Sequence, residues 1–128
     1  VPFVRTGDLV HISGQLSNDA SGGVKGTVGV DVTPEQANAA ARLCGVNLLA
    51  QIKAACDGDL SRVVRVVKLG GFVQAGPDFE AIPAVINGCS DLMVEVFGDA
   101  GRHARSAVGV YRLPLGFAVE VDAIVEIR

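Results

Sequence analysis

A cation and an anion near the C-terminus occupy stretches that are otherwise typical of buried strands. Arg105 comes just before an apolar run in RHARSAVGVYRLP, and Glu120 lies inside FAVEVDAIVEI. A planar guanidinium binds a carboxylate through two parallel hydrogen bonds, which lysine cannot reproduce. A carboxyl group in a partly apolar site activates water or transfers protons near neutral pH. These residue types predict a site that binds a small carboxylate and moves a proton.

Both residues also have a structural interpretation. An arginine at the start of a strand forms a structural ion pair about as often as it binds a ligand, and such pairs perturb their surroundings in the same way. A lone carboxylate such as Glu120 is more commonly the outward-facing residue of an edge strand. The residue types alone leave the functional and the structural interpretation of Arg105 and Glu120 open.

The two histidines, His11 and His103, are in unlike contexts, with no second histidine or paired cysteine at metal-ligand spacing. We therefore expect no metal site. His103 lies between Arg102 and Arg105, and neighbouring cations disfavour a charged imidazole. We expect His103 to stay neutral and to bind backbone rather than to act as a base.

The three cysteines predict neither a disulfide framework nor a zinc knuckle, because their number is odd and no C-x-x-C spacing occurs. Cys44 and Cys56 fall on or near a predicted helix, where a free thiol behaves as a small apolar group. Cys89 could lie nearer a cleft, but it has no adjacent histidine to activate it, which argues against covalent catalysis. A reducing cytoplasm is the simplest setting for these thiols.

The composition is that of one globular domain over residues 1–128, with 49% apolar and 20% charged residues. A net charge of −3 and only 5% aromatic residues argue against nucleic acid as a partner. No apolar run is long enough to cross a membrane. The glycine-rich SGGVKGTVG lacks the Lys-Ser/Thr of a phosphate loop, so we expect no nucleotide cofactor. Because the chain starts at Val1 and not at Met, we expect an N-terminal segment to precede it.

The hydrophobic pattern predicts the element order ββ-α-β-α-ββ, which is an α+β sheet with both helices on one face. A hairpin turn at 6–8 leads into a strand over 9–13, and 17–29 is a loop. Thr33, Pro34 and Gln36 form a capping box at the start of a long helix that Gly58 stops. The remaining expectations are a strand from Val63 to Phe72, a helix over 84–97 and strands over 107–111 and 119–127.

Four local features qualify this scheme. Gly45 in mid-helix indicates close packing against a neighbour, and Gly70-Gly71 indicates a bulge or a backbone that approaches a ligand. Val85, Leu92, Val96 and Phe97 are expected on the apolar face of the second helix, with Pro83 at its start. The last strand alternates apolar and charged residues, so the sheet face without helices needs a cover, and self-association would supply it.

Residues 102–124, RHARSAVGVYRLPLGFAVEVDAI, resemble the C-terminal signature of the reactive intermediate deaminase (Rid) family, also labelled endoribonuclease L-PSP. The family pattern is close to A-R-S-x-V-x-V-x-x-L-P-x-x-x-x-V/I-E-V/I-E-A-I. LVHISGQ resembles the family's early strand, and NLLAQIKAA with LSRVVRVVKLGGFV resembles its middle. The likeness spans most of the chain, and the C-terminal motif is its most specific part.

The resemblance implies a chorismate mutase-like α+β fold and a homotrimer whose sheets form a central barrel with three clefts between subunits. In deaminating members, the arginine matched by Arg105 holds the carboxylate of a 2-imino or enamine acid. The glutamate matched by Glu120 positions the attacking water. Asn87 matches a cleft residue of the family. The chemistry needs no metal or other cofactor, because the imine is already electrophilic.

This chain departs from deaminating members at two positions and in one segment. Phe3 stands where they often carry Tyr, and Ala107 stands where they often carry Cys, so both positions are candidate substrate-contacting residues that have lost a polar group. Residues 79–109 are longer than the corresponding segment of the best-known deaminases, which indicates a separate branch.

Three functions remain as hypotheses. The first is hydrolysis of reactive imines or enamines to 2-oxo acids and ammonia by a cytoplasmic trimer. The second is a trimer that binds or senses small carboxylates without turnover, which the substitutions at Phe3 and Ala107 would allow. The third is RNA cleavage, suggested by the family's older label and disfavoured by the acidic charge and the few aromatic residues.

Overall fold

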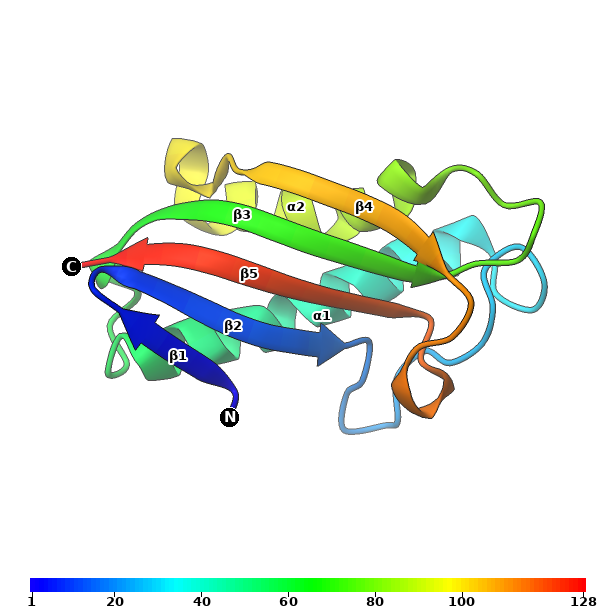
Figure 1. Ribbon diagram of the computed structural model, residues 1–128, viewed down its shortest axis with the longest axis horizontal. Helices are drawn as coiled ribbons and strands as arrows, with labels where there is room; N and C mark the ends of the chain where they lie inside the picture. Colours follow the sequence, from blue (N-terminus) through cyan, green and yellow to red (C-terminus); the bar gives the residue numbers. More distant parts are fainter.

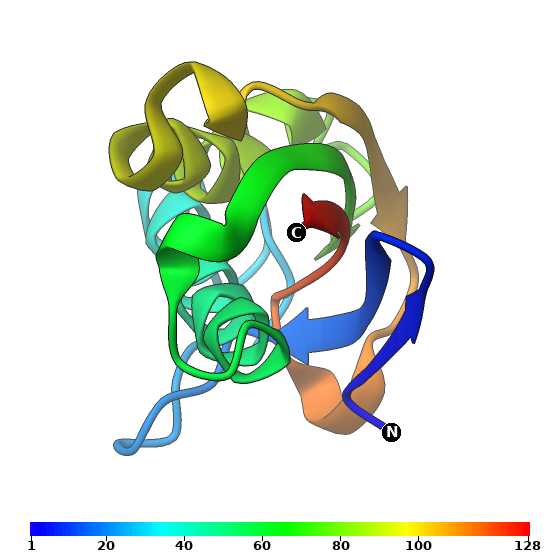
Figure 2. The same cartoon turned by 90° about the vertical axis from the view of Figure 1, so that its left-hand side faces the viewer.

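A computed structural model describes residues 1–128 as one five-stranded sheet with two long helices behind it (Figure 1). The chain order is ββ-α-β-α-ββ, as predicted, and both helices lie on the same face (Figure 2). The elements are β1 (Phe3–Thr6), β2 (Leu9–Leu16), α1 (Pro34–Ala55), β3 (Val63–Gln74), α2 (Ile82–Phe97), β4 (Ala104–Val110) and β5 (Val119–Ile127).

The strand order across the sheet is β1-β2-β5-β3-β4, so the C-terminal strand occupies the centre. β5 runs antiparallel to both of its neighbours, and β4 runs parallel to β3 along the other edge. Glu120 therefore does not lie on an edge strand, which corrects one structural interpretation of this residue. The crossover from β3 to β4 passes through α2, as a parallel connection requires.

The long helix α1 begins with the capping box that the sequence predicts. The Thr33 hydroxyl accepts from the Gln36 N–H, and the Gln36 side chain accepts from the Thr33 N–H. These bonds satisfy two backbone donors, a contribution of about 1 kcal/mol to helix stability. The predicted apolar stripe is buried against the sheet and α2: Ala37, Ala41, Cys44, Leu48 and Ile52.

The two helices pack closely at Gly45, which has no side chain. A Cβ at this position would lie 2.9 Å from Leu92 Cδ2 and 3.3 Å from Cys89 Sγ, so the predicted close approach is confirmed. The predicted apolar face of α2 is partly wrong, because Val96 is 42% exposed. The buried face instead includes Val85, Ile86, Cys89, Leu92 and Met93. It is therefore rotated about the helix axis relative to the predicted face, and Val96 lies outside it.

The glycine pair in β3 is not at a bulge, which corrects the sequence-based prediction. The register shifts between β3 and β5 fall between residues 63 and 68, ahead of the pair. A Cβ at Gly71 would lie 2.7 Å from Ile86 of α2, and a Cβ at Gly70 would collide with the Asp122 carboxylate on the opposite face. Both glycines are explained by side chains that lie across the backbone.

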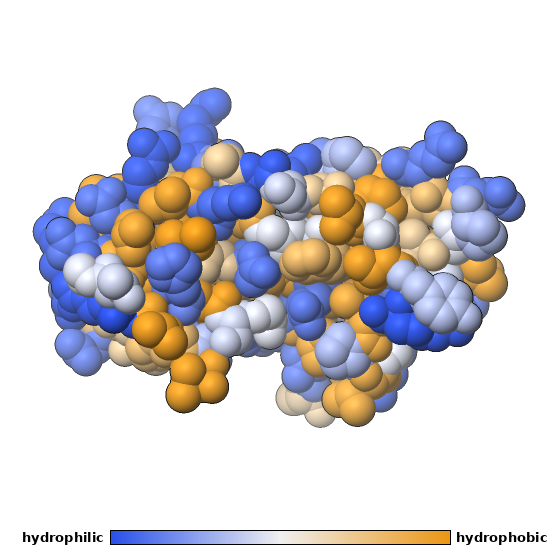
Figure 3. Space-filling model, in the orientation of Figure 1, coloured by the Kyte–Doolittle hydropathy of each residue, from blue (hydrophilic) through white to orange (hydrophobic).

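The two faces of the sheet differ in what covers them. Along β5, residues 119, 121, 123, 125 and 127 are buried under the helices, and the residues between them are half-buried on the other face. This open face faces the viewer in Figure 3, where apolar and polar side chains alternate. Its exposed apolar residues include Val4, Leu9 and Val108. Neither helix has the length and hydropathy required to cross a bilayer.

Candidate functional site

Arg105 lies inside β4, which begins at Ala104 and not at Ala107 as predicted. Its register partner on β3 is Leu69, a buried core residue, so the arginine faces the helices. β4 is an edge strand, and the half-buried side chain extends from it to α2. There Arg105 Nη1 donates to Asn87 Oδ1 at 2.8 Å and to Ser90 Oγ at 3.1 Å. The structure thus brings together Arg105 and Asn87, two of the residues predicted for the site.

No carboxylate pairs with Arg105. The ion pairs of the chain involve Arg5, Arg42, Arg62 and Arg102, so the interpretation of Arg105 as a structural ion pair is wrong for the single chain. Both acceptors of Arg105 are neutral, and its Nη2 and Nε atoms make no hydrogen bond to the protein. The charge is held in place but not neutralised. These free donors allow the guanidinium to bind an incoming carboxylate.

A series of hydrogen bonds runs from Arg105 through Ser90 of α2 to His103, which precedes β4. Ser90 Oγ lies 2.9 Å from His103 Nε2, and His103 Nδ1 lies 2.6 Å from the Gly101 carbonyl oxygen. The expectation that His103 binds backbone is confirmed by this second contact. Sequence reasoning missed Ser90, although its position one helical turn after Asn87 places both on one face of α2.

A pocket of about 310 Å³ opens beside these hydrogen-bonded residues at the edge of the sheet. Its lining is mostly polar, with Val94 as the one hydrophobic residue: Ser90, Asp91, Val94, Arg102, His103 and Arg105. Two arginines and one aspartate border it, and Arg102 also pairs with Asp99 at 3.3 Å. The pocket is open to solvent on one side of a cation that has no anionic partner, which favours a small anionic ligand.

Ala107 follows Arg105 by two residues and therefore faces the same side of β4. It is half-buried and packs against the hydrophobic core. The position matched to a cysteine in deaminating Rid proteins thus lies about 7 Å along the strand from the guanidinium-bearing residue. Cys89 of α2 does not substitute for that thiol, because it is fully buried and its pKa is raised by burial to about 12.

Glu120 lies on the other face of the sheet. Its register partners are Leu16 of β2 and Phe72 of β3, and its carboxyl carbon lies 2.7 Å from where a Cβ on Gly14 would be. The carboxylate makes no hydrogen bond or ion pair within the chain. Burial raises its pKa, and the nearby charge of Asp122 raises it further. A raised pKa makes the carboxylate a stronger base than an ordinary glutamate.

One chain therefore does not bring the two predicted catalytic residues together. Arg105 faces the helices from the edge strand β4, and Glu120 faces away from the helices on the central strand β5. Phe3 is also separate: it lies on β1 at the opposite edge, four strand spacings or roughly 19 Å from β4 when followed along the sheet. Phe3 pairs with Ile12 and packs on the core.

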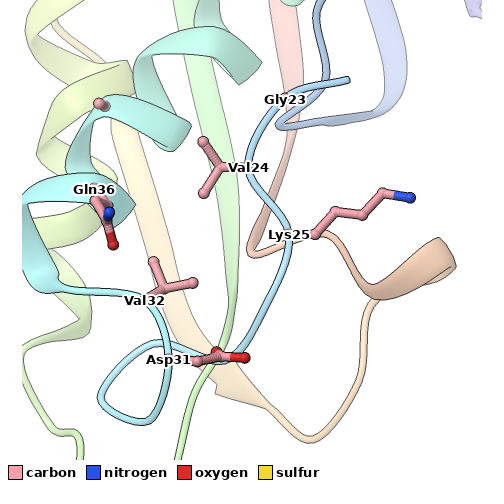
Figure 4. Close-up of a pocket in the computed structure, with 7 residues that line it drawn as sticks. Gly23, Val24, Lys25, Asp31, Val32 and Gln36 are labelled. Carbon is pink, nitrogen blue, oxygen red and sulfur yellow. The ribbon is translucent and has the colours of Figure 1, made fainter. Parts of the chain in front are cut away.

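A second pocket, of about 360 Å³, lies between the loop after β2 and the start of α1. Figure 4 shows Val24, Val32 and Gln36 around the hollow, with the amino end of Lys25 directed away from it. Lys25 Nζ lies 4.8 Å from the centre of the Phe117 ring, and Asp31 accepts from the Thr27 N–H. Both charges have partners inside the chain, and no titratable group is left to do chemistry there.

Comparison with known proteins gives the family. The model described as "YjgF/chorismate_mutase-like, putative endoribonuclease" matches residues 2–126. A protein of unknown function from Agrobacterium tumefaciens, Atu1372, is 52% identical with a TM-score of 0.98, over 100% of this chain and 81% of that one. A Shewanella oneidensis protein with the same endoribonuclease description is 33% identical with a TM-score of 0.95, over 99% of this chain and 84% of that one.

RidA from an Antarctic Psychrobacter is similar at a greater distance. It is 28% identical, with a TM-score of 0.66 over 98% of this chain and 86% of that chain. The backbone of this chain thus superposes more closely on the Agrobacterium and Shewanella proteins than on the Psychrobacter protein. The chain has the chorismate mutase-like α+β fold and belongs to the YjgF/Rid family.

Proposed function

We propose that the protein hydrolyses reactive 2-imino or enamine acids to 2-oxo acids and ammonia in a cleft between subunits. The observation that carries the proposal is Arg105, a half-buried guanidinium that no carboxylate neutralises and that borders a polar pocket. A 2-imino acid offers the carboxylate that this group binds. Its electrophilic carbon is one bond away from that carboxylate.

The cleft between subunits follows from the two faces of the sheet. Glu120 is on the open face and Arg105 is on the helix-covered face, so they act on one substrate only when the open face of one copy lies beside the β4 edge of another. The exposed apolar residues of the open face support such packing. A closed ring of three copies, the assembly implied by the Rid resemblance, would repeat the same contact three times.

The hydrolysis needs orientation and proton transfer but no cofactor. Arg105 fixes the carboxylate, and Glu120 of a neighbouring copy orients water toward the imine carbon. Burial raises the pKa of Glu120, and a carboxylate with a raised pKa is a stronger base toward that water than an ordinary one. Positioning of two reactants contributes several kcal/mol to such a reaction. The three unpaired cysteines support a reducing compartment such as the cytoplasm.

The test is the release of 2-oxo acid or ammonia from 2-imino acids that an amino acid oxidase generates in the assay. Wild-type protein should accelerate the release over the uncatalysed rate. Arg105→Ala should abolish the acceleration, because the carboxylate loses its only cationic partner in the pocket that is not already paired. Arg105→Lys keeps the charge but not the two-point geometry, and we expect roughly a 10-fold loss. Equal activity in wild type and Arg105→Ala would contradict the role of Arg105.

A carboxylate-binding protein without turnover is the second candidate. The absence of polar groups at Phe3 and Ala107 favours it, because deaminating relatives often place a hydroxyl and a thiol there. Calorimetry with 2-oxobutyrate, run beside the turnover assay, separates the two functions. Binding that depends on Arg105 without any acceleration of hydrolysis would identify a binding protein.

A further inference from the structure

Ser90 and His103 stand on the same side of the sheet as Arg105 and are hydrogen-bonded to it in series. We propose that these two residues form a proton shuttle that takes a proton from the attacking water and delivers it to the leaving amine of a substrate bound at Arg105. The inference rests on the proposed function. It adds two residues to the reaction and assigns them a step distinct from carboxylate binding.

The direction of each hydrogen bond follows from what each atom can do. The Gly101 carbonyl only accepts, so the 2.6 Å contact places the imidazole proton on His103 Nδ1. A neutral imidazole then has a lone pair on Nε2. Ser90 Oγ accepts from Arg105 Nη1 at 3.1 Å, and its own hydrogen is left to donate to Nε2 at 2.9 Å. The serine hydroxyl thus links the guanidinium to a proton acceptor.

The arrangement has the geometry of an oriented base, and the proposal therefore departs from the sequence-based expectation that His103 does not act as one. The base atom Nε2 points to a hydroxyl in the pocket, and the other ring nitrogen is anchored to backbone, which holds the ring in one tautomer. Of the other charged residues in the pocket lining, Arg102 is a donor only, and Asp91 makes no hydrogen bond to Arg105 or Ser90. Only His103 is connected to the binding cation and able to take up a proton.

The location explains why a proton-transferring group on the side of Arg105 is needed. Glu120 of the same chain faces away from the helices, and a second copy would have to supply it from across the cleft. Hydrolysis of an imine has two proton transfers, one from the water oxygen and one to the nitrogen. Glu120 of the second copy orients the water, and the Ser90–His103 pair carries out both transfers from the side of Arg105.

The proposed step is balanced as follows. The substrate is a 2-iminium carboxylate. Water attacks C2, and the C=N π electrons move to nitrogen. A proton of the attacking water passes through Ser90 Oγ to His103 Nε2. This gives a neutral carbinolamine group. The His103 imidazolium then protonates that nitrogen, the C–N bond breaks toward nitrogen, and the hydroxyl oxygen forms the C=O bond. The hydroxyl proton is released to the departing ammonia, so the products are a 2-oxo acid and an ammonium ion.

The experiment compares His103→Gln and Ser90→Ala with wild type, at saturating imino acid and with calorimetric binding of 2-oxobutyrate. We expect kcat to fall about 100-fold for His103→Gln and about 10-fold for Ser90→Ala, where a water can replace the hydroxyl. Affinity for 2-oxobutyrate should change by less than about 3-fold, because Asn87 still holds the guanidinium. Ser21→Ala, in an exposed loop, is the matched control and should behave as wild type.

A chemical rescue distinguishes proton transfer from positioning. Added imidazole should restore part of the activity of His103→Ala, and it should not restore Arg105→Ala. Loss of 2-oxobutyrate binding in parallel with kcat, or no rescue by imidazole in a His103→Ala protein that retains its circular dichroism spectrum, would overturn the shuttle. Unchanged kcat in His103→Gln would overturn it too, while the proposed function would stand. Absence of any turnover by wild type would instead reject the proposed function, and the shuttle with it.

Discussion

Each face of the sheet carries one charged candidate residue, and the two residues differ in their hydrogen-bond partners. On the helix-covered side, Arg105 reaches the polar face of α2 and is held by neutral acceptors beside a pocket. On the open side, Glu120 has no partner in the chain and lies next to Asp122, which is also half-buried. The first charge is held by hydrogen bonds within one protomer, and the second has no protein partner and keeps access to solvent.

This difference is what the proposed site between subunits requires of a single protomer. The Glu120 carboxylate is half-buried but still reaches solvent, and the neighbouring Asp122 adds like-charge repulsion. Proteins retain such groups where a ligand or another subunit completes the surroundings. The cation and the anion therefore belong to surfaces that one chain keeps apart.

The largest expected effect comes from mixing two inactive variants. Arg105→Ala and Glu120→Ala should each lack turnover. If the site lies between copies, co-expressed chains form mixed trimers in which roughly a quarter of the clefts combine an intact arginine from one chain with an intact glutamate from the next. Activity of the mixture should therefore recover to about a quarter of the wild-type value, measured as ammonia release.

Two controls accompany the mixing experiment. Variants that are purified separately and mixed without subunit exchange should remain inactive, and light scattering should give the mass of three chains. A mixture that stays inactive after confirmed co-assembly would show that Arg105 and Glu120 do not share a substrate.

The contacts of Arg105 illustrate what the sequence could not show. Its residue type and the family motif identified Arg105 as a candidate, but the predicted start of β4 was three residues too late. Its partners, Asn87 and Ser90, come from α2, and they face it only because β4 docks parallel to β3 after the crossover. Sequence periodicity describes one element at a time, so contacts between elements were beyond its reach.

Local patterns, in contrast, predicted most of the fold. The capping box of α1, its apolar stripe and the alternation of β5 each depend on neighbours in sequence, and the structure confirms all three. The predictions were wrong at positions whose surroundings depend on tertiary packing. Val96 has the right residue type for a core but faces solvent, and Gly70-Gly71 was interpreted as a bulge because side chains from β5 and α2 were not visible in the sequence.

That glycine pair offers a matched comparison of the two faces. Gly71→Ala would push a methyl group into Ile86, which is fully buried between α2 and the sheet, and overpacking of this kind costs about 1–3 kcal/mol. Gly70→Ala would meet the end of the Asp122 side chain on the open face, which can rotate away. We expect a loss below about 1 kcal/mol for Gly70→Ala. Urea unfolding of both variants measures the difference in free energy of unfolding.

The opposite ranking would have a definite meaning. A larger loss for Gly70→Ala than for Gly71→Ala would show that the open face is packed more tightly in the assembled protein than the helix-covered core is. The Asp122 carboxylate would then be fixed by a contact that a single chain does not contain.

The smallest expected effect is a pH-dependent gain in stability for Glu120→Gln. Burial, and then the charge of Asp122, raise the native pKa of Glu120 above its ordinary value of 4.5. The native state therefore binds this proton more tightly than the unfolded state does, and wild type loses stability as the pH rises through the native pKa. Glutamine removes that loss. Because the side chain is only half-buried, the gain at pH 7 should be about 0.5 kcal/mol.

Thermal unfolding at two pH values tests this sign. Glu120→Gln should raise Tm by about 2 °C at pH 7 and leave it unchanged well below pH 4.5, where the carboxyl is protonated in both the native and the unfolded state. Glu80→Gln, an exposed carboxylate in the loop before α2, is the control and should show no such difference. A destabilised Glu120→Gln at pH 7 would mean that the assembled protein gives the Glu120 carboxylate a cationic or donor partner. In that case the anion would be as well organised as Arg105, and the contrast between the two faces would be a property of the isolated chain only.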